Sequence, residues 1–222
     1  MSGLSVQYKH QKMQLPQVCS ATRQHGVGMI EVLVTLFILA IGMLGVASLQ
    51  FVGAFSNSDA LNRSNAVMVA QQMAERLRAN SYISSTVSGP VVDNNYFDPD
   101  LYNFESLTCA SSAPPWQCFC RQIPASIPDC NANTCSTAEL ARFDAWQMSC
   151  AASKIDPTVK LSLSCNDNNA GDADACSVGS RHRVMLTWPV ENWQNIDRQL
   201  NAVCNPDSDA EPVDCVVIDL VL

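Results

Sequence analysis

The N-terminal part of the chain carries one long run of apolar positions. Residues 32–55 form 24 consecutive positions without a charged residue or a proline. A helix of this length is about 36 Å long, which exceeds the roughly 30 Å hydrocarbon core of a bilayer. Because buried helices of soluble proteins seldom stay uncharged for so long, the pattern predicts a membrane-spanning helix over 27–55.

After residue 55 the pattern becomes amphipathic. Apolar residues recur at helical spacing, with polar residues between them. No proline occurs between Pro16 and Pro90. We therefore expect one helix of about 50 residues, whose amphipathic half covers 56–80 and packs on a domain core. Its core-facing positions are Ala66, Val69, Ala70, Met73 and Leu77.

The following segment, 81–135, is rich in proline, serine and asparagine, which is typical of a long loop. It ends at a capping-box pattern, with Ser136 and Glu139 three residues apart. This pattern predicts a short helix from Thr137 to about Ala151. Leu140 and Phe143 should face the interior.

Three strands are predicted near the C-terminus. Apolar and polar residues alternate over 159–163 and over 183–188, and 215–222 is a short apolar run. The predicted fold class is α+β: a long N-terminal helix, membrane-spanning in its first half, packed on a small antiparallel β-sheet. Residues 81–222 form the remaining domain.

Cysteine is the most unusual part of the composition. Of eleven cysteines, only Cys19 precedes residue 100. An even, dense set predicts a disulfide-rich domain in an oxidising compartment. The spacing fits a zinc site poorly. The sequence leaves the pairing open, with Cys204–Cys215 the best single guess because the two residues bracket a Pro-Asp loop. The disulfide candidates are Cys109, Cys118, Cys120, Cys130, Cys135, Cys150, Cys165, Cys176, Cys204 and Cys215.

Charge is distributed unevenly. Residues 1–26 carry three bases and no acid, whereas the remaining 196 residues carry 10 bases and 21 acids, a net charge of −11. The positive-inside rule then places the N-terminus in the cytoplasm and the cysteine-rich body in the periplasm. An acidic body also argues against nucleic-acid binding.

Glu31 is the one charged residue between Val27 and Phe55. A carboxylate in an apolar helix is costly in a membrane, although less so near the interface. If the chain were cut before Val27, the new α-amino group could pair with Glu31 of a neighbouring subunit and offset that cost. Two alternatives are a glutamate that reaches the interface at a helix start and a signal peptide cut near Ala54.

The segment His25–Val34 (HGVGMIEVLV) resembles the class III signal of type IV prepilins: a basic leader, a glycine, and an apolar helix with glutamate at its fifth position. The resemblance implies a leader over 1–26 and cleavage by prepilin peptidase between Gly26 and Val27. It also implies N-methylation of Val27 and a role for Glu31 in assembly.

Three further segments, 32–50, 135–146 and 183–188, resemble the PilV (type IV pilus modification protein) family of minor pilins. This resemblance implies a pilin-like fold, the inner membrane followed by the cell-surface pilus, and a role in pilus assembly and pilus-dependent adhesion or motility. The implied partners are other minor and major pilins and prepilin peptidase. Two alternatives remain: a minor pseudopilin of type II secretion, and a periplasmic binding domain on an uncleaved membrane anchor.

Other chemistry has little support. The acidic segment 167–174 offers oxygen ligands but misses the EF-hand pattern, so a solvated turn is favoured over calcium. The body has a single histidine, His182, between two arginines, and we expect it on the surface. Because catalytic and nucleotide-binding motifs are absent from the sequence, we expect no enzymatic activity, no cofactor and no small-molecule substrate.

Overall fold

The computed structural model describes Gly26 and residues 28–83, 89–109, 113–169, 171, 174–190, 199–206 and 210–222. The chain divides into two compact units, Met1–Phe51 and Val52–Leu222. Each unit is considered by itself.

Helix α1, Met29–Ala79, is 51 residues long and confirms the predicted helix of about 50 residues. Its first turn forms on Gly28, whose carbonyl accepts from the Glu31 amide at 2.9 Å. Arg76 and Arg78 lie in the last turn, where cations complement the helix dipole. The predicted core-facing positions are all buried: Ala66, Val69, Ala70, Met73 and Leu77.

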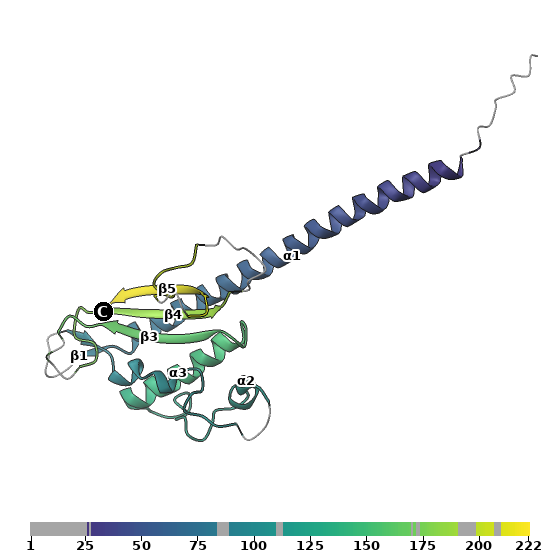
Figure 1. Cartoon of the computed structure of the whole chain (residues 1–222). Helices are drawn as coiled ribbons and strands as arrows, with labels where there is room; N and C mark the ends of the chain where they lie inside the picture. Colours follow the sequence, from purple (N-terminus) through teal and green to yellow (C-terminus); the bar gives the residue numbers. More distant parts are fainter. Residues whose placement is uncertain are drawn as a thin grey trace, which may run out of the picture. The chain divides into compact units, whose positions relative to one another are not determined.

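A three-stranded antiparallel sheet forms the centre of the second unit. Its strands are β3 (Lys160–Asn166), β4 (Arg181–Pro189) and β5 (Val213–Val221), in the order β3-β4-β5. All three overlap the predicted strands. The sheet lies beside α1 (Figure 1). Alternate residues on one face of the sheet pack with the buried residues of α1 in a single core. The core-facing sheet residues are Leu161, Leu163, Val184, Leu186, Val216 and Leu220.

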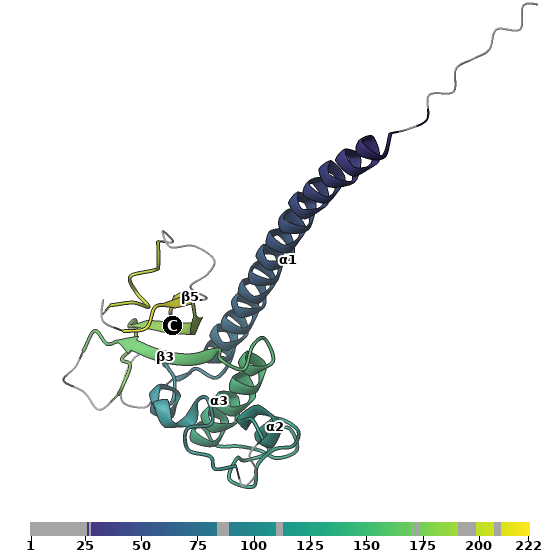
Figure 2. The same cartoon turned by 45° about the vertical axis from the view of Figure 1, so that its right-hand side comes forward.

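Helix α3, Thr137–Ser153, completes this core (Figure 2). Both reciprocal bonds of the capping box are present at Ser136 and Glu139, as the sequence predicted. Phe143 is buried, whereas Leu140 is half-buried. The fold is thus the predicted α+β arrangement.

The predicted loop over 81–135 contains short elements that the sequence analysis missed. These are strands β1 (Tyr82–Ile83) and β2 (Pro90–Val91), the 3-10 helices η1 (Asn94–Phe97) and η2 (Pro99–Leu101), and helix α2 (Pro115–Phe119). Local caps explain η1 and η2, because the Asp93 and Asp98 carboxylates accept backbone N–H groups of their first turns.

Asn103, which follows η2, is held by a distant strand. Its side-chain amide donates to the Leu161 carbonyl at 2.9 Å and accepts from the Leu161 N–H at 2.8 Å. The side-chain amide thus makes the two hydrogen bonds that the backbone of a neighbouring strand would make with β3. Asn103 adopts a φ of +52°, a left-handed conformation that asparagine tolerates better than most residues.

Five disulfides join the ten body cysteines, and they include Cys204–Cys215. Cys120–Cys150 ties the end of α2 to α3, beside a small apolar cluster that contains Phe143 and Trp146. The remaining pairs are Cys109–Cys118, Cys130–Cys135 and Cys165–Cys176.

Candidate functional site

The candidate processing site lies immediately before α1. Gly26 is exposed, and a Cβ atom added there would meet no described atom within 4 Å. Packing within the chain therefore does not require a glycine at this position. Val27, the predicted first mature residue, lies outside the described residues, as does the leader before Gly26. The predicted roles of Gly26 and Val27 stay predictions.

Glu31 lies in the first turn of α1 and is exposed. The helix dipole places partial positive charge at this end, which favours a carboxylate there. At about 1.5 Å per residue, Val27 precedes Glu31 by roughly one helical turn in sequence. A carboxylate at this position has the right chemistry to pair with an ammonium group.

The residues that follow present an apolar surface that no other described part of the chain covers. Every residue from 28 to 54 is exposed. By length and composition, α1 is apolar enough to cross a membrane. Such a surface needs lipid or other apolar helices around it. Its largest exposed side chains include Ile30, Leu33, Phe37, Leu44, Leu49 and Phe51.

The acidic segment 167–174 is described only in part, since Ala170, Asp172 and Ala173 lie outside the described residues. The Asp167 carboxylate accepts from the Ser177 N–H at 3.0 Å and the Ser180 hydroxyl at 3.1 Å. These hydrogen bonds lower the pKa of Asp167 to about 2. Asp167 thus fastens the loop onto the start of β4.

His182 corrects a prediction, because it is buried rather than on the surface, with 2% of the residue exposed. It precedes Val184 and Leu186 on the core-facing side of β4 and packs against Phe97. Its Nδ1 lies 3.2 Å from the Ser180 carbonyl, so Nδ1 carries the proton. Among the described residues, Nε2 has no hydrogen-bond partner. Burial lowers the pKa of His182.

We expect the second unit to lose stability on mild acidification because of His182. The unfolded chain binds a proton near pH 6.5. The folded chain binds it only at lower pH, so its stability is complete above 6.5 and falls as the pH drops below that value. Urea unfolding of the full chain in detergent micelles, monitored by tryptophan fluorescence, should show this between pH 7.5 and about 5.5.

His182→Leu keeps the position apolar and removes the titration. It should flatten the pH dependence in this window, where the carboxylates of Asp93 and Asp219, with lowered pKa values, do not titrate. An equal pH dependence in the two proteins would contradict the assignment.

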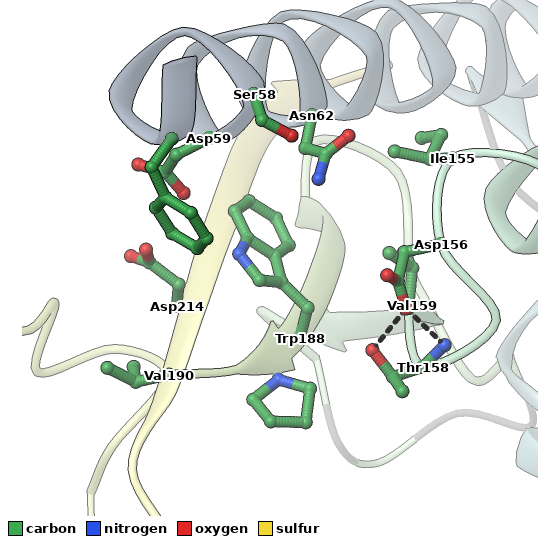
Figure 3. Close-up of a pocket in the computed structure, with 12 residues that line it drawn as sticks. Ser58, Asp59, Asn62, Ile155, Asp156, Thr158, Val159, Trp188, Val190 and Asp214 are labelled. Atoms are coloured by element: carbon green, nitrogen blue, oxygen red, sulfur yellow. Dashed lines mark hydrogen bonds between the residues drawn. The ribbon is translucent and has the colours of Figure 1, made fainter. Parts of the chain in front are cut away.

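A pocket of about 210 Å3 opens in the second unit, and the sequence analysis did not predict it. Figure 3 shows Trp188 at its centre, with Asp59 and Asp214 to one side and Asp156 to the other. One feature of the sequence pointed to it: the core-facing positions of α1 change from apolar to polar at Asn62. The lining residues come from α1, the α3–β3 turn, β4 and β5, which sequence alone does not bring together.

Comparison with known families gives one match. The prokaryotic N-terminal methylation motif matches residues 21–47, which include Gly26, Val27 and Glu31. Neither curated proteins nor solved structures gave a significant match. The motif implies processing by prepilin peptidase and assembly with other pilins, and together with the apolar helix it fits a membrane-anchored protein. The motif, the long helix and the disulfide-rich α+β domain support a type IV pilin-like protein, either a pilin or a pseudopilin.

Proposed function

We propose that this chain is a minor pilin of the type IV pilus, of the PilV kind, that takes part in pilus assembly and in pilus-dependent adhesion or motility. The observation that carries the proposal is the position of Glu31, fifth after Gly26, directly before the uncharged and largely exposed stretch 32–55 of α1. In an assembly, the amine of a neighbouring subunit could pair with this carboxylate and offset the cost of its burial. We also propose that the chain is a substrate of prepilin peptidase and has no catalytic activity itself.

The proposed topology follows from charge and disulfides. Residues 1–26 are basic, and all ten cysteines after residue 100 form disulfides. Basic flanks stay in the cytoplasm, and disulfides persist in the periplasm and outside the cell. The subunit would wait in the inner membrane and then enter the pilus through α1.

Cleavage after Gly26 is the first expected result. N-terminal sequencing of the protein from its host should give Val27 as the first residue, carrying an N-methyl group. In cells without prepilin peptidase the leader should remain. Gly26→Leu should block cleavage in cells that have the peptidase, because the signal that this segment resembles has a glycine before the cut, whereas the described fold has room for a Cβ there. An N-terminus upstream of Val27 in wild-type cells, or one near residue 55, would remove the proposal.

The matched variant for the assembly step is Glu31→Ala. We expect normal cleavage but at least a tenfold loss of the subunit from sheared pili, because the charge that pairs with the amine is gone; a tenfold change corresponds to about 1.4 kcal/mol. Thr35→Ala, one turn further along α1, is the control and should enter pili normally. Normal incorporation of Glu31→Ala would count against amine pairing.

A minor pseudopilin of type II secretion is the second candidate, since the methylation motif supports pilins and pseudopilins alike. A deletion strain separates the two. Loss of surface pili with normal enzyme secretion supports the pilin, and the opposite result supports the pseudopilin.

A further inference from the structure

The outer edge of β5 carries backbone groups that the rest of the sheet does not use. Figure 1 shows β5 as the outermost strand of the sheet, on the side away from α3, and among the described strands it pairs only with β4. Along such a strand, every second residue points its N–H and C=O groups away from the sheet. Where nothing covers these groups, they are a template for a further strand.

The first half of this edge is covered by side chains. The Asn205 amide accepts from the Val213 N–H and donates to the Val213 carbonyl, both at 2.9 Å. Arg63 of α1 donates to the Cys215 carbonyl at 3.3 Å. Val213 and Cys215 are therefore residues whose backbone groups point outward, and both already have partners.

The second half of the edge has no such cover. The same alternation turns the backbone groups of Val217, Asp219 and Val221 outward. In the part of the chain that the structure describes, none of these N–H and C=O groups has a hydrogen-bond partner. Successive outward residues lie about 6.8 Å apart, and the backbone of another extended strand repeats its donors and acceptors at the same distance.

The side chains around this window are those of a sheet that could continue. On the core side, Ile218 and Leu222 pack against the core but are only half-buried. On the outer side, Val221 is 59% exposed. Charged residues commonly protect an edge, but Asp219 is already neutralised by Arg183. An added strand with apolar side chains on the core side would bury more of Ile218 and Leu222.

We propose that the window 217–221 of β5 receives an extended strand of a different pilin subunit. The choice of a pilin subunit rests on the proposed function. An antiparallel strand fits best, because both pairs of this sheet are antiparallel and this pairing is the more stable per residue. A peptide-binding sheet edge of this kind takes its affinity from backbone hydrogen bonds and its specificity from alternate side chains.

A second copy of this chain is disfavoured as the partner. The antiparallel register that overlaps the whole window is centred on Asp219, so two copies would place their Asp219 carboxylates directly opposite each other. Each body also carries a net charge of −11 over residues 27–222, and two such bodies repel each other. The added strand therefore has apolar residues at every second position and no carboxylate opposite Asp219.

Strand binding is tested on the full chain in detergent micelles, independently of leader cleavage. The probe is the peptide Ac-KTVTVTVK-NH2, and the readout is the backbone amide resonances of Val217, Asp219 and Val221. Without peptide these amides should exchange rapidly with water. With peptide we expect a saturable shift of all three and slower exchange. Amides that are protected without peptide would show that the chain covers its own edge, and the proposal would be wrong.

Two isomers of the peptide separate backbone pairing from apolar contact. With valine side chains on the core side, the threonine N–H groups face β5 and the valine N–H groups face away. N-methylation of the three threonines should therefore weaken binding by at least about tenfold, because three hydrogen bonds are lost. N-methylation of the three valines should leave binding nearly unchanged. Equal binding of the two isomers would overturn the proposal.

A matched pair of variants tests the same contact from the side of the chain. Val217→Pro removes one outward N–H and leaves the ladder with β4 intact, as edge strands tolerate. It should weaken peptide binding by about tenfold. Val217→Thr keeps the N–H and should bind normally. Equal binding by the two variants would contradict the assignment, and if Val217→Pro does not fold, the two peptide isomers decide.

The partner is tested in the host with a photo-crosslinking residue in place of Val221. The control position is Ser162, which is exposed on β3, two strands away. We expect a product with a different pilin subunit from position 221 alone, with a lower yield in Val217→Pro. No product, or a product between two copies, would overturn the assignment. If the peptide binds but the chain is never cleaved after Gly26, the proposed function fails while the strand-binding edge stands.

Discussion

Replacing Asp144 with alanine is expected to lower the free energy of unfolding of the second unit by about 3 kcal/mol. Asp144 lies in α3 and is 1% exposed. Its Oδ1 accepts from Arg76 of α1. Its Oδ2 accepts from the Asn80 amide at 2.6 Å and from the Tyr96 hydroxyl at 2.7 Å. One carboxylate thus joins the end of α1, α3 and η1.

The expected size follows from what the substitution leaves behind. Removal of one partner of a buried ion pair costs about 3–5 kcal/mol, because the other groups lose their partner without regaining water. The lower end applies here, because 32% of the Arg76 side chain is exposed and can turn toward solvent. Tyr96 has no such freedom, since it is 1% exposed and its pKa is raised by burial and by Asp144.

The measurement is urea unfolding of the full chain in detergent micelles at pH 7.5, monitored by tryptophan fluorescence with the disulfides intact. Asp144→Asn keeps the shape and should lose less than the alanine variant. The matched control is Asp219→Ala. Asp219 pairs with Arg183 on the exposed face of the sheet, where such pairs contribute about 1 kcal/mol or less. If Asp144→Ala and Asp219→Ala lost the same amount, the buried network would not be the connection described.

The parts of the fold that the sequence predicted are those that local chemistry determines. The 24 uncharged residues and the lack of proline predict α1, and Ser136 with Glu139 predicts the start of α3. Strand alternation predicts β3 and β4. The short elements over 82–119 were missed because each is only two to five residues long, and because distant partners hold some of the residues around them. Asn103, for example, owes its position to the backbone of Leu161, 58 residues away.

The prediction of a surface position for His182 failed for a different reason, because the strand pattern already indicated burial. Apolar and polar residues were predicted to alternate over 183–188, and the same alternation extended by two residues places His182 on the face of Val184 and Leu186. The flanking Arg181 and Arg183 suggested a surface position instead. The exposure of one residue in a strand says little about the exposure of the next residue, since successive side chains point to opposite faces.

The candidate processing site was predictable because Gly26, Val27 and Glu31 lie within six positions of one another and the methylation motif is read along the chain. The pocket around Trp188 was not, because its lining residues come from α1, the α3–β3 turn, β4 and β5. Disulfide pairing has the same limit. Cys204–Cys215 closes a short loop, whereas Cys120–Cys150 spans 30 residues and depends on how α2 packs on α3.

Loss of the Cys120–Cys150 disulfide is the second large expected effect. Replacing both cysteines with alanine should lower the free energy of unfolding by about 3.6 kcal/mol, the loop-closure term for a loop of roughly 30 residues. The bond also lies beside the apolar cluster of Phe143, Trp146 and Cys150, against which described residues of the 104–130 segment pack. The Trp146 indole donates to the Phe119 carbonyl at 3.0 Å, so the segment has a second attachment that keeps it from detaching entirely.

The matched control is the double alanine variant of Cys130 and Cys135, which lie five residues apart. The same term gives about 2.1 kcal/mol for so short a loop, so the two variants should differ by about 1.5 kcal/mol. Urea unfolding of the full chain in micelles measures both, and double replacement removes both sulfur atoms of the lost bridge, so neither can exchange with the other bridges. If the short loop costs as much as the long one, chain entropy does not set the contribution of these bonds. Packing around Cys150 in the folded state would then have to account for the free energy of unfolding that the Cys120–Cys150 disulfide contributes.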